Sequence, residues 1–316
     1  MKHTKYNAPA LSPLPIRAGV AASYLWLQKG SWVTLLEFLN QRFPDVGEDV
    51  WKDRMARAEV VDEHGTPYHA TSPYRWGGRI FYYRELDSET LIPFEEHILF
   101  QDQHILVVDK PHFLPVIPTG RFLHQTLLVR LKNRYNLAEL SPIHRLDRET
   151  AGVIIFSLHA ATRGVYQSLF QQRAVKKEYE ALAADLPDYQ APFIYRSRMV
   201  EGTPFFRMQE VAGSANSETH IERLEQHCGG SAFSRYRLLP VTGRKHQLRV
   251  HLSALGIPIL NDAFYPLALP CKADDMSRPL QLLARSIAFT DPISGQERYF
   301  ASQRKLHPPA MPDCSG

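Results

Sequence analysis

The stretch from Ile143 to Ala160 reads IHRLDRETAGVIIFSLHA and joins a charged segment to an abrupt apolar run. The run GVIIF (152–156) is continuous and rich in β-branched residues, which predicts a buried strand. Gly152 at its start permits a close approach of another backbone. We therefore expect Asp147 on a loop that leads directly into a central strand.

Two interpretations of Asp147 remain open from its local chemistry. It could be an ordinary loop carboxylate that caps a turn. Alternatively, the nearby Arg145 and Arg148 supply positive charge, which keeps a carboxylate ionised and able to act as a nucleophile or a base. The charged segment marks a candidate catalytic residue without deciding its role.

A second stretch, VTGRKHQLRVHLSALGIP (241–258), predicts a helix that starts near Arg244 and stops at Gly256. Arg249 lies off the apolar face of this helix, on the same side as His246. An arginine in that position either extends its guanidinium to solvent or pairs with a buried carboxylate. The apolar face comprises Leu248, Leu252 and Leu255.

A third stretch, VKKEYEALAAD (175–185), has the residue alternation of a strand and places Tyr179 on one of its faces. Tyr179 is either an ordinary half-buried aromatic residue of a sheet or a surface on which a nucleobase stacks. In the second case Lys176 and Lys177 would lie near phosphates.

The chain beyond residue 90 is richer in predicted strands than in predicted helices, and the two do not alternate regularly. This pattern predicts an α+β fold with a mixed, largely antiparallel central sheet and flanking helices. The expected strands are 104–109, 152–158, 177–183, 196–200, 233–241 and 283–289. The expected helices are 125–136, 160–174 and 244–255.

The chain before residue 90 differs in character. Residues 1–25 are rich in proline and alanine and predict an extended arm, whereas 26–90 predict a small module of two helices and short strands. Residues 91–316 then form the main domain. The plain interpretation of the arginine side chains in the module is a solvated face; these side chains are Arg54, Arg57, Arg75 and Arg79.

The composition excludes several classes of protein. The chain has 37 basic and 33 acidic residues, a net charge of +4 that is compatible with a polyanionic partner. Three widely separated cysteines (Cys228, Cys271 and Cys314) favour a reducing compartment, and neither they nor the 14 histidines show zinc-ligand spacing. No apolar run reaches the roughly 18 residues of a membrane span, and no signal peptide is recognisable. We expect a cytoplasmic protein without disulfides, metal or membrane association.

The three stretches, taken in order, resemble the signature of the RluA family of RNA pseudouridine synthases. The matching segments are HRLDRETAG (144–152), KEY (177–179) and TGRKHQLRVH (242–251), preceded by VVDKP (107–111). The resemblance covers roughly residues 95–300. Ala151 and Lys245 depart from the usual residues of the signature, but neither is one of the main catalytic positions.

The resemblance implies a role for each matched residue. Asp147 corresponds to the catalytic aspartate, Arg249 to the arginine that pairs with it, and Tyr179 to the tyrosine that stacks on the uracil. Arg145 corresponds to the arginine that fills the gap when the uridine flips out of the RNA. Residues implied to bind substrate or to order the loops are Thr150, Arg244, His246 and Gln247. No cofactor is implied.

The implied function is isomerisation of specific uridines to pseudouridine in structured rRNA or tRNA by a monomeric enzyme with the pseudouridine synthase fold and its catalytic cleft. The N-terminal module resembles, more weakly, the small RNA-binding domain that many members carry. A non-catalytic RNA-binding protein that retains the fold is the alternative. A nucleosidase would need a second carboxylate, and Glu149 is expected to project differently from Asp147.

Overall fold

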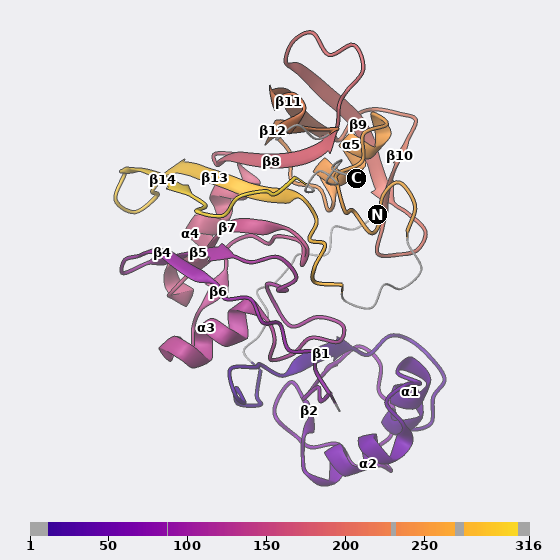
Figure 1. Cartoon of the computed structure of the whole chain (residues 1–316). Helices are drawn as coiled ribbons and strands as arrows, with labels where there is room; N and C mark the ends of the chain where they lie inside the picture. The colour runs from indigo at the N-terminus through magenta and orange to yellow at the C-terminus, as the bar shows by residue number, and fades with distance from the viewer. Residues whose placement is uncertain (1–11, 87, 229–231, 269–274, 309–316) are drawn as a thin grey trace, which may run out of the picture. The chain divides into compact units, whose positions relative to one another are not determined.

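The computed structural model describes residues 12–86, 88–228, 232–268 and 275–308 (Figure 1). It divides the chain into two compact units. The smaller unit contains Met1–Thr90 and Pro118–His124, and the larger unit contains Leu91–Ile117 and Gln125–Gly316. The first 11 residues of the predicted arm lie outside the described residues, as do Cys271 and Cys314.

The smaller unit packs two helices, α1 (Leu35–Arg42) and α2 (Glu48–Ala56), against a three-stranded antiparallel sheet. Helix α1 is capped by Thr34, whose Oγ1 accepts a hydrogen bond from the Glu37 amide (3.1 Å), and the Glu37 carboxylate accepts one from the amide of Val33, the residue before the cap (2.8 Å). The strand order is β1–β3–β2, with bounds Ser23–Trp26 (β1), Arg79–Tyr82 (β3) and Val60–Asp62 (β2).

Strand β1 begins within the predicted extended arm of residues 1–25 and shows that the end of this arm pairs with β3 of the sheet. Its residues alternate between the two faces of the sheet, so that Leu25 packs against the core while Tyr24 is exposed. Further back, the Tyr83 hydroxyl donates to the Pro15 carbonyl (2.7 Å) and Arg17 pairs with Glu59 (2.5 Å). Tertiary contacts that a proline-rich sequence does not reveal therefore order the described part of the arm.

The predicted solvated basic face of this unit is only partly correct. Arg54 is 4% exposed and its Nε lies 3.3 Å from a carboxylate oxygen of Glu85. Arg57 pairs with Glu59 at 2.9 Å, and Arg79 also reaches a carboxylate. Most of these positive charges are thus neutralised within the unit.

The larger unit is built on an eleven-stranded sheet whose neighbouring strands run in the order β10–β9–β11–β12–β8–β13–β7–β5–β4, with β14 beside β13 and β6 beside β7. All described pairs are antiparallel except β7 with β13. This confirms the predicted α+β class. The strands are β4 (His97–Gln101), β5 (Ile105–Lys110), β6 (Ser141–Pro142), β7 (Ala151–Ser157), β8 (Lys176–Ala184), β9 (Phe193–Glu201), β10 (Met208–Val211), β11 (Ser217–Glu225), β12 (Phe233–Pro240), β13 (Leu282–Thr290) and β14 (Glu297–Ala301).

The helices of this unit are α3 (Leu127–Tyr135), α4 (Ala160–Gln171) and α5 (Gln247–Ala254). Helix α4 packs on β7, whereas α5 packs on β9, β10 and β11. All predicted strands and helices of the main domain are present, but five of the observed strands were not predicted: β4, β6, β10, β14 and the longest of them, β11. Its inward-facing residues include Ser217 and Thr219, which are buried hydroxyl residues, so the strand lacks an apolar alternation.

Helix α5 starts three residues later than predicted, at Gln247. His246 before it has a left-handed backbone conformation (φ 55°), which cannot continue into an α-helix. Of the predicted apolar face, Leu248 and Leu252 are buried. The predicted stop is confirmed, since Gly256 follows with a φ of 79°.

Gly152 lies in a row of paired residues across three strands. It pairs with Ala284 of β13, which pairs on its other side with Tyr179 of β8. A Cβ atom added at Gly152 would lie 2.2 Å from the Ala284 carbonyl oxygen, and its φ of 114° suits only glycine. This close approach leaves only β13 between the strand that follows the Asp147 loop and the strand that carries Tyr179.

We expect Gly152→Ala to lower the free energy of unfolding by about 2–5 kcal/mol, because strain at a positive φ adds to overpacking against β13. Gly164→Ala is the matched control. Gly164 lies in α4 with nothing within 4 Å of an added Cβ, so alanine there should stabilise by about 0.5–1 kcal/mol. Urea denaturation of both variants measures the difference, and equal effects would contradict the packing argument.

Candidate active site

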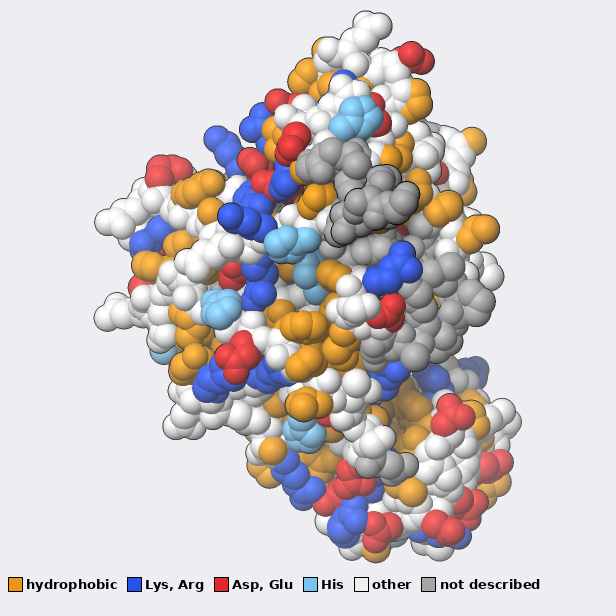
Figure 2. Space-filling model, in the orientation of Figure 1, with side chains coloured by type: hydrophobic (Ala, Val, Ile, Leu, Met, Phe, Trp, Pro, Cys, Tyr) orange, Lys and Arg blue, Asp and Glu red, His pale blue; other side chains and the backbone are white. Residues whose placement is uncertain are grey.

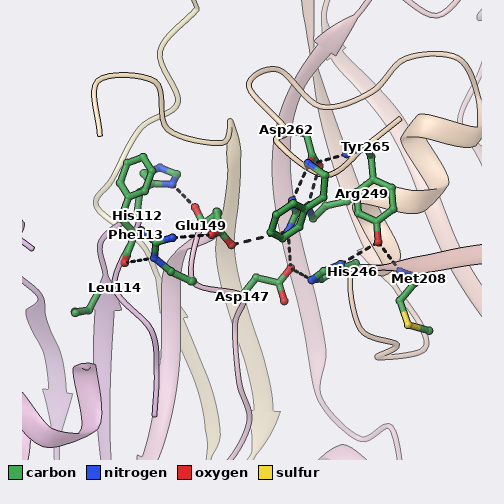
Figure 3. A network of polar contacts seen from close by, with 12 residues as sticks. His112, Phe113, Leu114, Asp147, Glu149, Met208, His246, Arg249, Asp262 and Tyr265 are labelled. Atoms are coloured by element: carbon green, nitrogen blue, oxygen red, sulfur yellow. Dashed lines mark hydrogen bonds and ion pairs between the residues drawn. The ribbon is translucent and has the colours of Figure 1, made fainter. Parts of the chain in front are cut away.

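Asp147 lies on the loop between β6 and β7, with its side chain 28% exposed. Its Oδ2 atom lies 3.4 Å from Arg249 Nη1 and 3.8 Å from His246 Nε2 (Figure 3). The Asp147 carbonyl also accepts a hydrogen bond from the Thr150 amide at 3.2 Å, which closes the loop into a turn. The carboxylate is therefore accessible on one side and held by nitrogen atoms on the other.

Arg249 is 1% exposed, so the interpretation that its guanidinium extends to solvent is wrong. Its main partner is Asp262, whose two oxygens accept from Nε (2.8 Å) and Nη2 (2.6 Å). The ring centroids of Phe264 and Tyr265 lie 4.8 Å and 5.5 Å from the guanidinium carbon. A bidentate ion pair of this kind fixes the arginine, so that the remaining Nη1 is aimed at Asp147.

Charges around Arg249 keep it ionised. Burial alone would lower its pKa, but the hydrogen bonds and charge of Asp262, together with the charges of Asp147 and Glu149, raise the pKa of Arg249 above its ordinary value. Glu149 Oε2 lies 4.0 Å from Arg249 Nη1. Glu149, which was expected to project differently from Asp147, still reaches the same Nη1 atom, so that one guanidinium faces three carboxylates.

His246 is neutral at neutral pH, because burial lowers its pKa to about 4 more strongly than the charge of Asp147 raises it. Its Nδ1 atom lies 2.9 Å from the Tyr265 hydroxyl, which accepts a hydrogen bond from the Met208 amide at 2.8 Å. This arrangement favours the tautomer in which the hydroxyl donates its proton to Nδ1 and the imidazole proton lies on Nε2, toward Asp147.

Lys110 joins the loop of Asp147 to the end of β5. It is fully buried, and its ammonium donates to the carbonyl oxygens of Pro111 (2.9 Å), Leu114 (2.9 Å) and Arg148 (3.0 Å). Burial lowers the pKa of Lys110 to about 7 against the opposing charges of nearby carboxylates. Lys110 belongs to the matched segment VVDKP but had no predicted role. In the structure its hydrogen bonds hold the Asp147 loop against the end of β5.

A second set of contacts holds the same two loops together. Arg148 Nε donates to the Phe113 carbonyl (3.0 Å), and His112 Nδ1 lies 2.6 Å from the Glu149 carbonyl oxygen (Figure 3). Arg148, which had no predicted role, therefore positions the backbone beside Asp147.

Tyr179 is half-buried on β8, and its hydroxyl makes no hydrogen bond within the described ranges. Burial, and to a lesser extent the charge of Asp147, raise the pKa of Tyr179 above its ordinary value. The side chain is thus a neutral phenol close enough to Asp147 to sense its charge.

The remaining predicted site residues divide by burial. Arg145 is exposed and makes no hydrogen bond or ion pair with any residue that the structure describes. Arg244 is also exposed, with Nε 3.2 Å from the Asn216 carbonyl oxygen. Thr150 and Gln247 are buried, which fits the predicted role of ordering the loops. On the face in Figure 2, Lys, Arg and His side chains gather over the middle of the larger unit.

Gln247 shows how loop ordering works. Its Oε1 accepts from the Thr242 hydroxyl (2.6 Å) and the Arg244 amide (3.1 Å), while its Nε2 donates to the Glu218 carbonyl and Thr219 Oγ1, both at 2.9 Å. All its hydrogen-bonding atoms are occupied within the protein. These bonds hold the turn that precedes α5 and thereby place Arg249.

His251, also in the third motif, is fully buried between hydroxyl groups, with Nε2 2.9 Å from Ser217 Oγ and Nδ1 2.9 Å from Thr219 Oγ1. Burial lowers the pKa of His251 to about 4. Between this value and the unfolded value of about 6.5, the unfolded chain binds more protons than the folded chain. The stability that the neutral ring contributes is present above pH 6.5 and is lost as the pH falls toward 4.

We expect the difference in free energy of unfolding between the wild type and His251→Gln to shrink as the pH falls from 6.5 to 4, by up to about 1.4 kcal/mol per pH unit. Groups common to both proteins cancel in the difference. Urea denaturation at a series of pH values measures it, with the range above pH 7 as the internal control. A pH-independent difference would show that the ring is not held neutral.

Among the described residues, no group of three or more His, Cys, Asp and Glu side chains is arranged to hold a metal ion. Within the same ranges, no helix combines the length and apolar character needed to cross a membrane.

A family model described as RNA pseudouridylate synthase matches residues 104–254. The chain is 36% identical over 209 residues to the dual-specificity RNA pseudouridine synthase RluA of Haemophilus influenzae, covering 64% of this chain and 90% of that protein. It is 36% identical over 218 residues to RluA of Yersinia pestis, covering 66% and 99%. The match to mouse pseudouridylate synthase RPUSD2 is 37% identical over 177 residues but spans only 30% of that protein.

Two solved structures share the fold. Human RNA pseudouridylate synthase domain containing 4 aligns with a TM-score of 0.51 at 27% identity, over 66% of this chain and 88% of that one. Human RNA pseudouridylate synthase domain containing 1 aligns with a TM-score of 0.54 at 24% identity, over 69% and 86%.

Proposed function

This chain belongs to the RluA family of RNA pseudouridine synthases, and we propose that it converts uridine to pseudouridine in RNA with Asp147 as the attacking group. The observation that carries the proposal is the partly exposed carboxylate of Asp147 at 3.4 Å from a buried arginine that Asp262 holds in place. A nucleophilic carboxylate must be ionised, and the positive charge of Arg249 favours that form.

The reaction breaks the bond between N1 of the base and C1′ of the ribose and forms a bond between C5 and C1′. The base turns in between, the proton on C5 leaves, and N1 gains a proton, so atoms and charge balance without a redox partner. In this scheme the carboxylate of Asp147 forms a transient bond to the nucleoside, and that bond breaks when C5 joins C1′, which returns the free carboxylate. Arg249 positions and screens Asp147, and the ring of Tyr179 stacks on the uracil. The neutral His246 directs its Nε2 proton toward the same carboxylate.

We further propose that the substrate is a structured rRNA or tRNA, and that the enzyme acts as a cytoplasmic monomer. A stacked uridine must leave the RNA helix to reach Asp147. In this proposal the exposed Arg145, two residues away in sequence, occupies the resulting gap. The positive net charge of the chain supports a polyanionic substrate.

The function is tested with RNA labelled with tritium at C5 of uridine. The wild-type protein should release tritium to water in proportion to the pseudouridines found by chemical mapping of the same RNA. Folded protein that releases no tritium from total rRNA and tRNA would overturn the proposal and favour the non-catalytic RNA-binding alternative.

A further inference from the structure

The smaller unit exposes three large aromatic side chains around its edge strand β1. Tyr24 is 51% exposed, Trp26 56% and Trp76 64%. Side chains of this size are usually buried, and a group of them on a surface marks an interaction site.

The first two rings belong to one face of the sheet, because Tyr24 and Trp26 are two residues apart on β1. Trp26 pairs with Arg79 of β3, whose guanidinium lies 4.9 Å from the Trp26 ring. Tyr24 pairs with Phe81, with 6.1 Å between ring centroids. Each exposed ring thus rests against a neighbour on the adjacent strand, which limits its motion.

The turn that carries Trp76 is pinned to the end of β1. The Leu27 amide donates to the Gly78 carbonyl (2.9 Å), and the Gly77 amide donates to the Leu27 carbonyl (2.8 Å). The Tyr74 hydroxyl donates to the Gln28 carbonyl at 2.5 Å. These bonds hold residues 74–78 beside residues 27–28, so that the third ring belongs to the same surface region.

Charge near the aromatic residues is mostly positive, although Arg79 pairs with Glu63 at 3.4 Å. The segments 20–30 and 72–82 contain Lys29, Arg75 and Arg79 but no aspartate or glutamate. Lys29 and Arg75 are exposed and form no ion pair with any residue in the described part of the chain. Elsewhere on the unit basic and acidic side chains are interspersed (Figure 2), and Arg54 and Arg57 are paired with carboxylates.

We propose that this surface, defined by Tyr24, Trp26, Trp76, Lys29 and Arg75, binds unpaired nucleotides of RNA by stacking of their bases. Aromatic rings accept any base, and unpaired cations beside them attract the phosphates. Only the choice of RNA as the ligand rests on the proposed function. It assigns the smaller unit a role in holding single-stranded RNA while the larger unit does the chemistry.

The test compares full-length wild-type protein with Tyr24→Ala/Trp26→Ala in binding to a short single-stranded oligouridylate. Loss of stacking should weaken binding by about tenfold or more, whereas binding to inorganic polyphosphate, which has charge but no bases, should not change. Tyr299→Ala is the matched control, since Tyr299 is 67% exposed on β14 of the larger unit. The single variant Trp26→Phe keeps an aromatic ring at this position and should bind oligouridylate about as tightly as the wild type.

Tyr24→Ala/Trp26→Ala should also raise the KM for substrate RNA without lowering kcat. In the wild type, bound RNA should quench the fluorescence of Trp26. An unchanged affinity for oligouridylate would overturn the proposal, as would an equal loss for polyphosphate. A change of oligomeric state with unchanged RNA affinity would identify a protein interface instead. Since binding is measured without turnover, failure here is distinct from a failure of pseudouridine formation.

Discussion

Asp147→Asn is expected to lower the rate of pseudouridine formation by a factor on the order of 10⁴ or more. Asparagine preserves the shape of the side chain beside Arg249 and His246, so the fold and the RNA-binding surface should persist. It has no negative charge with which to attack carbon, so the chemical step should fail. Binding of substrate RNA should therefore stay within a few-fold of the wild type.

Single-turnover tritium release and RNA binding, measured on the same preparation, separate these two effects. Asp188→Asn is the matched control, because Asp188 is exposed on a loop of the same unit with a left-handed φ of 56° that asparagine tolerates. Slow deamidation of the substituted asparagine would regenerate the wild-type aspartate, so Asp147→Ala is measured in parallel. An active alanine variant would remove Asp147 from the mechanism.

Asp262→Ala is expected to lower both stability and activity. Arg249 would remain buried without its bidentate partner, and an unpaired buried charge costs about 3–5 kcal/mol. The guanidinium would also lose the two hydrogen bonds that aim Nη1 at Asp147, and the amides of Phe264 and Tyr265 would lose their acceptor. Urea denaturation and tritium release measure the two losses separately.

A double variant, Arg249→Met/Asp262→Leu, distinguishes the structural role of this pair from its catalytic role. Removing both charges together should recover most of the lost stability, because apolar side chains of similar volume replace a buried ion pair at little cost. Activity should stay low, because Asp147 would lack its positive partner. Recovery of activity along with stability would show that Arg249 acts only through the fold.

The arrangement around Asp262 also shows where sequence reasoning stops. Asp262 lies in NDAFYP (261–266), which follows the pattern of a turn and matches none of the motifs used. Its carboxylate faces Arg249, 13 residues away along the chain. The sequence predicted that Arg249, if buried, pairs with a carboxylate. The periodicity of the sequence does not indicate which carboxylate the fold brings to it.

Elements with strong local patterns were predictable. The run GVIIF forms β7 because continuous β-branched residues suit a strand that is buried on both faces. The strand around Tyr179 and the end of the helix at Gly256 were likewise predictable from the residues next to them in the sequence. Strand β11 was not, because its buried residues are hydroxyl side chains that serve His251.

The sequence by itself determined the fold class, the strands that flank the Asp147 loop and the identity of the motif residues, because these depend on local periodicity and on residue types in order. Only the tertiary structure decided which charges are paired. It buried Arg249 against Asp262, inserted Lys110 among three carbonyl groups and left Trp26 exposed beside Arg79. Ion pairing and exposure depend on distances between distant parts of the chain, and these exist only after strands such as β7, β13 and β8 have aligned.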